Sequence, residues 1–314
     1  MRSSPRAVAG VGRPVLAAVT MFGLASAGIE LTREGERLAS VWLANAAIIA
    51  LLLRTERQHW TPLFGASFLA NTAAGLVAGD TSALAIALAA CNLAEIALVA
   101  CLFERRYPVP ATLDTPARLT MLAVLAIVGS LASTGLAGLS LAVLDDPAAS
   151  EPLARWLIAD CLGILILTPL LVTLAQPRNE RLGGHPLDYA LLLVAGAIIT
   201  ALVFKGHYPF LFLIAPVLML AGLRLPLQRC VMLVLVVSAS AMAVAVKGWG
   251  PLELPPITEG ARIFLIQAFM ATAVALPWPW PPSARNARRP PLLSARAKSI
   301  TACLPIMAAI SSCA

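Results

Sequence analysis

Residues 156–172 read WLIADCLGILILTPLLV, and this run decides the class of fold. The run is apolar enough to lie in a lipid bilayer, whose hydrocarbon core of about 30 Å requires about 20 residues of helix. One carboxylate, Asp160, lies inside it. A charged side chain in hydrocarbon costs roughly 2.5–3.5 kcal/mol on insertion scales. Asp160 must therefore have a partner, a water-filled cavity or a proton, which makes it a candidate functional residue.

The composition of the whole chain agrees with a membrane protein. Hydrophobic residues make up 59% of the 314 residues and charged residues only 12%, whereas soluble domains have about 25% charged residues. The net charge of +7 comes from basic residues in short loops, a pattern typical of membrane topology, so we expect no nucleic-acid partner. The six cysteines form no CxxC pair and are predicted to be buried free thiols, without disulfides or a zinc site.

Apolar runs recur along the chain and predict an all-α, polytopic helix bundle of about ten transmembrane helices, with eight to ten as the expected range. The second and eighth runs are short and are expected to be tilted or partly re-entrant. The first resembles a cleavable signal peptide, but we expect it to stay as the first helix because many spans follow. The ten runs are 14–31, 38–53, 60–78, 82–103, 119–144, 154–174, 187–204, 208–223, 226–246 and 261–276.

The basic residues predict the orientation of these spans. With ten spans and the N-terminus inside, twelve Lys and Arg residues before residue 277 fall on the cytoplasmic side and six on the outer side. This excess predicts that both termini are cytoplasmic. The loops before residue 277 are too short to fold as soluble domains, and they contain no GxGxxG, P-loop, HExxH or GxSxG motif. We therefore expect no catalytic site, no metal site and no cofactor.

Polar residues inside the predicted spans are the candidate site. Counting about 1.5 Å per residue places Asn45, Asn71 and Asp160 at one depth, roughly 10 Å below the outer face. Asn92 and Glu95 are expected nearer the middle of the membrane, on one helix face because they are three residues apart. Two interpretations stay open. In the first, the asparagines only join helices by hydrogen bonds. In the second, the carboxyl groups have a functional role, because they are costly to place inside a membrane.

Tryptophans begin two of these spans at the predicted outer interface. Trp42 and Trp156 have the amphipathic rings that anchor helices at the level of the lipid headgroups. Trp42 is also kept as a ligand-binding or signalling candidate.

Four segments together resemble a known family, the type-one membrane-associated sensor (MASE) domain of bacteria. They occur in the family's order, and the likeness covers roughly residues 14–276, most specifically 40–175. Leu43 and Ala46 replace the family's usual proline and glycine, so this turn is expected to be more regularly helical. The segments are SVWLANA at 40–46, similar to S-x-W-P-A-N-G; HWTPLFGASFLAN at 59–71; NLAEIA at 92–97, similar to N-x-x-E; and 156–169, similar to W-x-x-x-D-x-x-G-x-x-x-x-x-P.

The resemblance implies a sensory input module in the bacterial inner membrane. Such a module usually precedes a cytoplasmic histidine kinase, diguanylate cyclase or cyclic-di-GMP phosphodiesterase. The matched polar positions carry over as ligand or signalling candidates: Asn45, Asn71, Asn92, Glu95 and Asp160. The expected partners are the lipid bilayer, a small-molecule or protein stimulus, and a second copy or another membrane protein.

Two other functions stay open at this point. A secondary transporter would use Asp160 and Glu95 as a path for a proton or a cation. A membrane scaffold would act through the helices of a partner protein.

The composition changes after Leu276. Residues 277–314 contain seven prolines, five basic residues and no acidic residue, and they begin with PWPWPP. If the codons of these six residues are read from the third base of each, they encode apolar residues that would continue the last helix toward the cytoplasm. We therefore hypothesise a frameshift near residue 277 that removed an output domain, the alternative being a natural proline-rich tail. The expected organisation is a sensor domain at 1–276 and a non-domain tail at 277–314.

Overall fold

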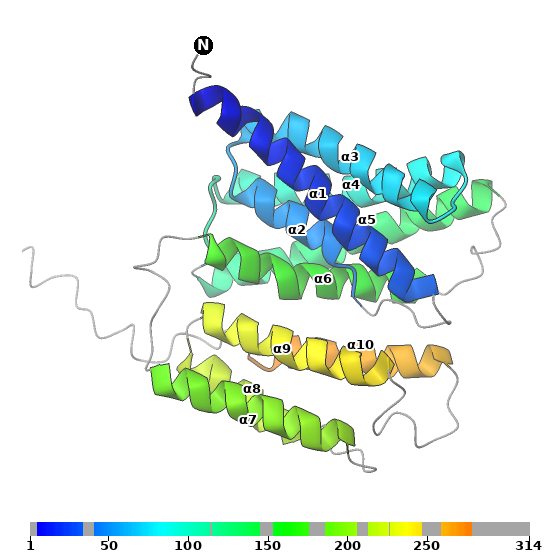
Figure 1. Ribbon diagram of the computed structural model, residues 1–314. Helices are drawn as coiled ribbons and strands as arrows, with labels where there is room; N and C mark the ends of the chain where they lie inside the picture. Colours follow the sequence, from blue (N-terminus) through cyan, green and yellow to red (C-terminus); the bar gives the residue numbers. More distant parts are fainter. Residues whose placement is uncertain are drawn as a thin grey trace, which may run out of the picture. The chain divides into compact units, whose positions relative to one another are not determined.

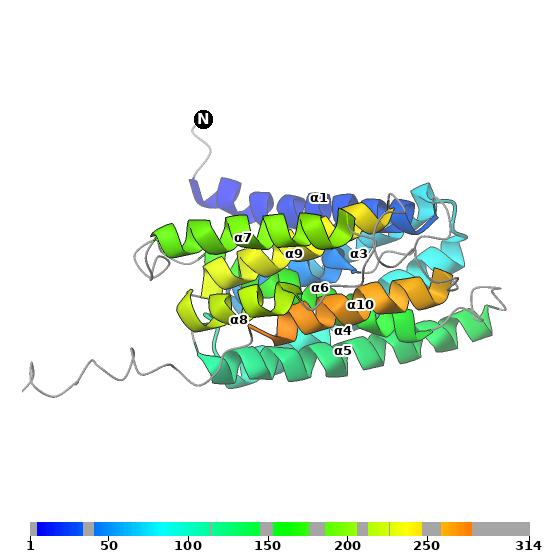
Figure 2. The ribbon, with the colours of Figure 1, turned by 90° about the horizontal axis from the view of Figure 1, so that it is seen from below.

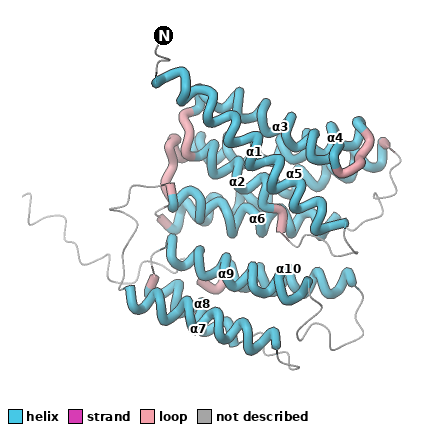
Figure 3. Tube along the Cα trace, in the orientation of Figure 1, coloured by secondary structure: helices cyan, strands magenta, loops and turns pink. Residues whose placement is uncertain are grey.

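A computed structural model describes residues 5–33, 41–113, 115–144, 153–175, 186–205, 213–225, 227–246 and 259–277. Within these ranges every regular element is helical and no strand occurs, as Figure 3 shows. The tail at 278–314, with the proposed frameshift, lies outside the described residues. The elements are α1 Pro5–Arg33, α2 Leu43–Leu53, η1 Arg57–His59, α3 Trp60–Val77, α4 Ser82–Arg106, α5 Pro116–Val143, α6 Leu153–Leu174, α7 Pro186–Lys205, α8 Ile214–Arg224, α9 Leu227–Val246 and α10 Glu259–Ala275.

The helices begin and end at local signals in the sequence. The Thr81 hydroxyl accepts a hydrogen bond from the Leu84 amide at 3.3 Å and so caps α4. Thr115 does the same for α5, where Pro116 occupies the first helical position. Such hydroxyls and an N-terminal proline satisfy or remove the free amides at a helix start. After α3, Gly79 has a φ of 92°, a conformation that suits glycine.

Each of the ten predicted runs falls on one of the ten described helices. Four helices are long and apolar enough to cross a membrane: Gly12–Glu30 within α1, and α4, α5 and α6. Shorter apolar stretches accompany them at Leu43–Leu53, Tyr189–Thr200, Ile214–Arg224, Gln228–Ala241 and Phe264–Ala275. The all-helical membrane class is thereby confirmed, while the count of ten spans stays a prediction.

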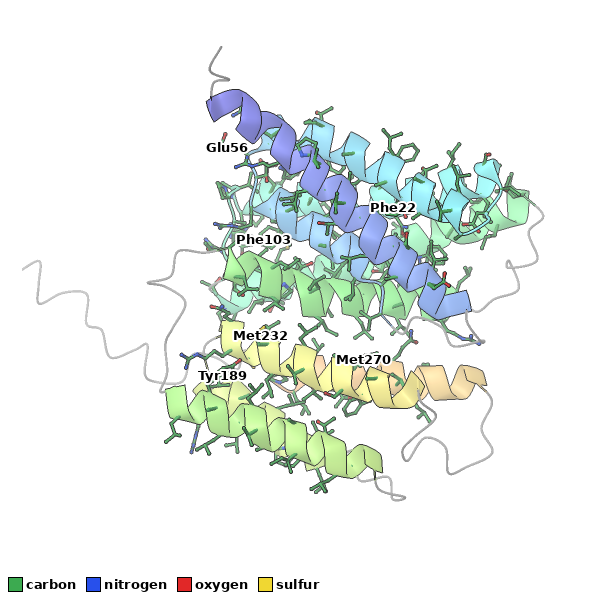
Figure 4. All side chains as sticks on the ribbon, in the orientation of Figure 1. Phe22, Glu56, Phe103, Tyr189, Met232 and Met270 are labelled. Carbon is green, nitrogen blue, oxygen red and sulfur yellow. The ribbon has the colours of Figure 1, made fainter. Side chains whose placement is uncertain are left out.

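The helix α6 belongs to two hydrophobic cores. Ile164 of α6 is buried in a core with α1 to α5, whereas Leu162 and Ile166 are buried in a second core with α7 to α10. In Figure 1 α6 lies between α2 and α9, and both helices contact it. Figure 2, turned by 90°, shows the helices running roughly along one common direction. Phe103 from the first core and Met270 from the second are labelled in Figure 4.

The outward faces of the helices are also apolar. Phe22 on α1, labelled in Figure 4, and Val128 on α5 are exposed to the surroundings of the bundle. A soluble bundle turns polar residues outward, whereas a face that meets lipid is apolar. These surfaces agree with a multi-pass membrane protein. On α7 the exposed residues follow helical spacing: Leu187, Leu191, Val194, Ile198 and Leu202.

Candidate functional site

The short helix α2 rests directly on the backbone of α6. The Trp42 amide, just before α2, donates a hydrogen bond to the Ala159 carbonyl at 3.0 Å. One turn further along α6, a Cβ atom added at Gly163 would lie 1.9 Å from the Trp42 carbonyl oxygen. Only a glycine at 163 therefore lets the two backbones approach so closely.

Three further hydrogen bonds hold α2 against its neighbours. The Thr168 hydroxyl donates to the Ala46 carbonyl at 3.0 Å. At the other end of α2, the Arg54 guanidinium donates to the carbonyls of Ala111 at 2.8 Å and Ala175 at 3.1 Å. Hydrogen bonds thus hold both ends of α2 to α6 or to the residue that follows it.

Asn45 projects from the first turn of α2 onto α4. Its Nδ2 group donates to Asn92 Oδ1 at 3.1 Å and to Glu95 Oε2 at 2.5 Å. The Trp42 indole N–H donates to Asn45 Oδ1 at 3.3 Å, which fixes the orientation of the amide. Asn92 and Glu95 lie on one face of α4, as their spacing predicts, and all three side chains are buried.

Glu95 is also bonded from α5. The Ser130 hydroxyl donates to Glu95 Oε1 at 2.6 Å, and both residues are fully buried. The neighbouring Gly129 allows this approach, because a Cβ atom there would lie 2.6 Å from Val99 Cγ2. Each oxygen of the Glu95 carboxyl group thus accepts a hydrogen bond from a different helix.

Asp160 completes the cluster from α6. Its side chain is 2% exposed, and it lies close enough to Glu95 for the two carboxyl groups to influence each other electrostatically. Its Oδ2 atom has no hydrogen-bond partner in the described part of the chain. We name Asn45, Asn92, Glu95, Ser130 and Asp160 the polar cluster; it joins α2, α4, α5 and α6.

The amino end of α2 contributes a positive electrostatic potential at the polar cluster. Trp42 is its N-cap, and no side chain caps the first turn. Free amides and the helix dipole at a helix start favour nearby negative charge. Since Asn45 of this first turn is bonded to Glu95, the start of α2 lies close to that carboxyl group.

The sequence predicts two layers of polar residues at different depths, but the structure brings four of these residues together. Asn45 and Asp160 meet Asn92 and Glu95, which the sequence had placed deeper in the membrane. The hydrogen bonds of Asn45 to Asn92 and Glu95 contradict the predicted separation, whereas the depth of each residue in the membrane stays a prediction. The two predicted layers are therefore one cluster.

Asn71 stands apart from it. Asn71 on α3 is 6% exposed, and its Nδ2 atom has no partner among the described residues. No hydrogen bond between described residues joins Asn71 to the polar cluster, so the predicted layer does not include it here.

Sequence reasoning missed three residues that build the site. Ser130 was not among the predicted candidates, although its hydroxyl donates a hydrogen bond to Glu95. Thr168 and Gly163 hold α2 in place. Gly163 stands three residues after Asp160 in an otherwise bulky apolar run, and this is the one signal that could have indicated a close helix contact.

The described residues hold no group of three or more His, Cys, Asp or Glu side chains that could bind a metal ion. Cys91, Cys101, Cys161 and Cys230 are free thiols, whereas Cys303 and Cys313 lie outside the described residues.

The chain resembles proteins of a known family. The family model MASE1 matches residues 14–276. The chain belongs to the MASE1 family. MASE1 is a membrane sensor domain of signalling proteins, so this chain is a sensory input module of the bacterial inner membrane. No solved structure matches the chain.

One curated relative of this MASE1 chain comes from Escherichia coli (strain K12), where it is named "Probable diguanylate cyclase DgcE". It is 27% identical over 215 residues, which is 66% of this chain and 18% of the relative. The chain thus spans less than a fifth of the length of that relative, and the matched part is that of a sensor domain.

Proposed function

We propose that the polar cluster is the part of this sensor domain that changes state when a stimulus binds. The observation that supports this role is Glu95 of α4, which accepts hydrogen bonds from α2 and α5 and has the buried Asp160 of α6 beside it. A stimulus acts by binding one arrangement of these helices more strongly than another, and this difference shifts the populations.

The output of the sensor is proposed to be a cytoplasmic signalling enzyme. Likeness to a probable diguanylate cyclase supports cyclic-di-GMP synthesis as the first output to test. We place catalysis in that output domain and not in the helix bundle. Ten spans with both termini cytoplasmic, as the basic residues indicate, bring the end of α10 to the side where such a domain works.

The test fuses residues 1–276 in frame to a diguanylate cyclase domain and measures cyclic-di-GMP in cells. Replacing Asn45 by Ala or Glu95 by Gln is expected to change the output several-fold, because each change breaks a bond between helices. The matched control is Glu104→Gln, which alters the exposed ion pair with Arg57 outside the polar cluster. Folded Asn45 and Glu95 variants with unchanged output would contradict the proposal.

A secondary transporter is the alternative function. Its specific support is the short helix α2 that begins beside intramembrane carboxyl groups, since transporter sites are built at the ends of interrupted helices. Solute or cation flux into proteoliposomes that is lost in Asp160→Asn would favour the transporter. Output of the fusion that responds to a stimulus, without flux, would favour the sensor.

A further inference from the structure

The hydrogen bonds between α2 and α6 show that these two helices run parallel. The bonded pairs follow the same order along both helices: Trp42 with Ala159, Ala46 with Thr168, and Arg54 with Ala175. Ala175 directly follows the last residue of α6, and Arg54 directly follows the last residue of α2. The carboxyl ends of α2 and α6 therefore lie side by side.

Arg54 places a positive charge between these two helix ends. The carboxyl end of a helix carries a partial negative charge of roughly half an elementary charge, so a cation there is stabilising. Arg54 is the C-cap of α2 and is half-buried. Its guanidinium donates to the Ala175 carbonyl at 3.1 Å. The charge of Arg54 thus offsets the repulsion between the two like ends of the parallel helices.

No carboxylate among the described residues balances the charge of Arg54. Its hydrogen bonds go to backbone carbonyls, and its Nε atom is buried without a partner in the described ranges. Arg57, at the same end of the bundle, is exposed and forms an ion pair with Glu104. Because a charge shielded from water is costly without an opposite charge, the helix ends must provide the compensation for Arg54.

The connection from α4 to α5 is bonded to the same place. The Ala111 amide donates to the Leu53 carbonyl at 2.7 Å, and the Ala111 carbonyl accepts from Arg54 at 2.8 Å. Ala111 and Leu113 are both buried, so this part of the connection packs into the bundle. One side chain, that of Arg54, thus joins the ends of α2 and α6 to the segment between α4 and α5.

We propose that Arg54 is a positioning residue of the sensor, which transmits a change at Asn45 to the other end of the bundle. The proposal rests on the proposed role of the polar cluster and adds its path to the side predicted to be cytoplasmic. Asn45 lies in the first turn of α2 and Arg54 follows the last turn, so one rigid helix of 11 residues connects them. When Asn45 loses its bonds to α4, α2 shifts, and Arg54 displaces the end of α6 and Ala111.

Distances between two spin labels, measured by electron paramagnetic resonance, test this path in the purified full chain in lipid nanodiscs. In a background without native cysteines, the labels are attached at Ala117→Cys in the first turn of α5 and Leu174→Cys at the end of α6, both exposed positions. Asn45→Ala is expected to shift the distance between the labels by about 1–2 Å, a common size of helix shifts. In Arg54→Gln the same change should produce no shift. Arg57→Gln is the matched control and should leave the shift unchanged.

A residue that only stabilises the fold would give another result. Arg54→Gln would then lower the unfolding temperature, yet Asn45→Ala would still shift the distance, and this would overturn the proposal. An unchanged distance in Asn45→Ala with Arg54 present would overturn it too. If Arg54→Gln does not fold, Arg54→Lys replaces it, because lysine lacks the planar fork of donors that reaches both carbonyls. A full shift in Arg54→Lys would overturn the proposal, and a reduced shift supports it.

The distances and the fusion output separate this proposal from the sensor role of the polar cluster. A changed output of the Asn45→Ala fusion with unchanged label distance would leave the sensor role standing and overturn the path through Arg54. Conversely, the expected distances together with unchanged output support the path and contradict only the role of the cluster in signalling.

Discussion

Ser130 and Ser133 lie one turn apart on α5 and are both fully buried, yet only Ser130 has a hydrogen-bond partner among the described residues. Ser130→Ala is expected to lower the free energy of unfolding by about 1–2 kcal/mol, because Glu95 loses a donor. Ser133→Ala is the matched control and should have almost no effect. Thermal unfolding in bicelles measures both, and equal losses would show that the Glu95 bond contributes nothing.

Asn45 and Asn71 permit a second comparison at the scale of the residue. Asn45 donates to two side chains on α4, whereas Asn71 Nδ2 has no partner in the described ranges. Asn45→Ala is expected to lower the free energy of unfolding by about 1–3 kcal/mol, since it leaves a buried carboxyl group with one donor fewer. Asn71→Ala should cost less. Thermal unfolding in bicelles also measures the stability of both asparagine variants. A larger loss of stability in Asn71→Ala than in Asn45→Ala would contradict the place of Asn45 in the polar cluster.

At the scale of the element, the contact of α2 with α6 depends on Gly163. Gly163→Ala would place a methyl group 1.9 Å from the Trp42 carbonyl oxygen. We expect α2 to shift and the protein to lose about 1–3 kcal/mol of stability, as overpacked sites do. Gly135 on α5 is the control, because nothing lies within 4 Å of a Cβ atom there. Gly135→Ala should be neutral or stabilising, since alanine favours the helix.

Two measurements follow the Gly163 variant. Unfolding temperature in detergent reports its stability. In a background in which the other five tryptophans are replaced by Phe, the quenching of tryptophan fluorescence reports whether Trp42 has moved. A variant as stable as Gly135→Ala, with unchanged quenching, would be incompatible with the backbone contact described for α2 and α6.

The elements could be predicted from the sequence more closely than their contacts. Apolar length fixes where a membrane helix lies, so the predicted run 60–78 corresponds to α3 at Trp60–Val77. The run 38–53 gave no sign that α2 starts only at Leu43, because the apolar residues before it continue the pattern. The predicted separation of Asn45 from Glu95 was wrong, because their hydrogen bond depends on how the short helix α2 packs against α4. Side-chain partners such as Ser130 depend on how helices rotate against each other, which composition does not encode.

At the scale of the whole molecule, the predicted orientation can be measured on α3. Gln58 precedes α3 and Ser82 follows the turn after it, and both are exposed. Since α3 has 18 residues and helices rise about 1.5 Å per residue, its ends approach opposite faces of the hydrocarbon core. In a background without native cysteines, Ser82→Cys is expected to react with a membrane-impermeant thiol reagent added outside, and Gln58→Cys is not.

Permeabilised cells serve as the control for this labelling, because both positions should then react. Labelling of Gln58→Cys in intact cells, with protection of Ser82→Cys, would reverse the orientation inferred from the basic residues. Equal labelling of both in intact cells would show that α3 does not span the bilayer.

The enclosure of α6 by both cores has a mechanical consequence. Between Arg155 and Thr173 every residue of α6 is buried or half-buried among the described residues, so the helix that carries Asp160 offers little surface to lipid chains. Bilayer tension, thickness or lipid composition must act first on helices with outward apolar faces, such as α1, α5 and α7. The polar cluster is therefore insulated from direct lipid forces. Any membrane-borne stimulus reaches Asp160 as a movement of its neighbours.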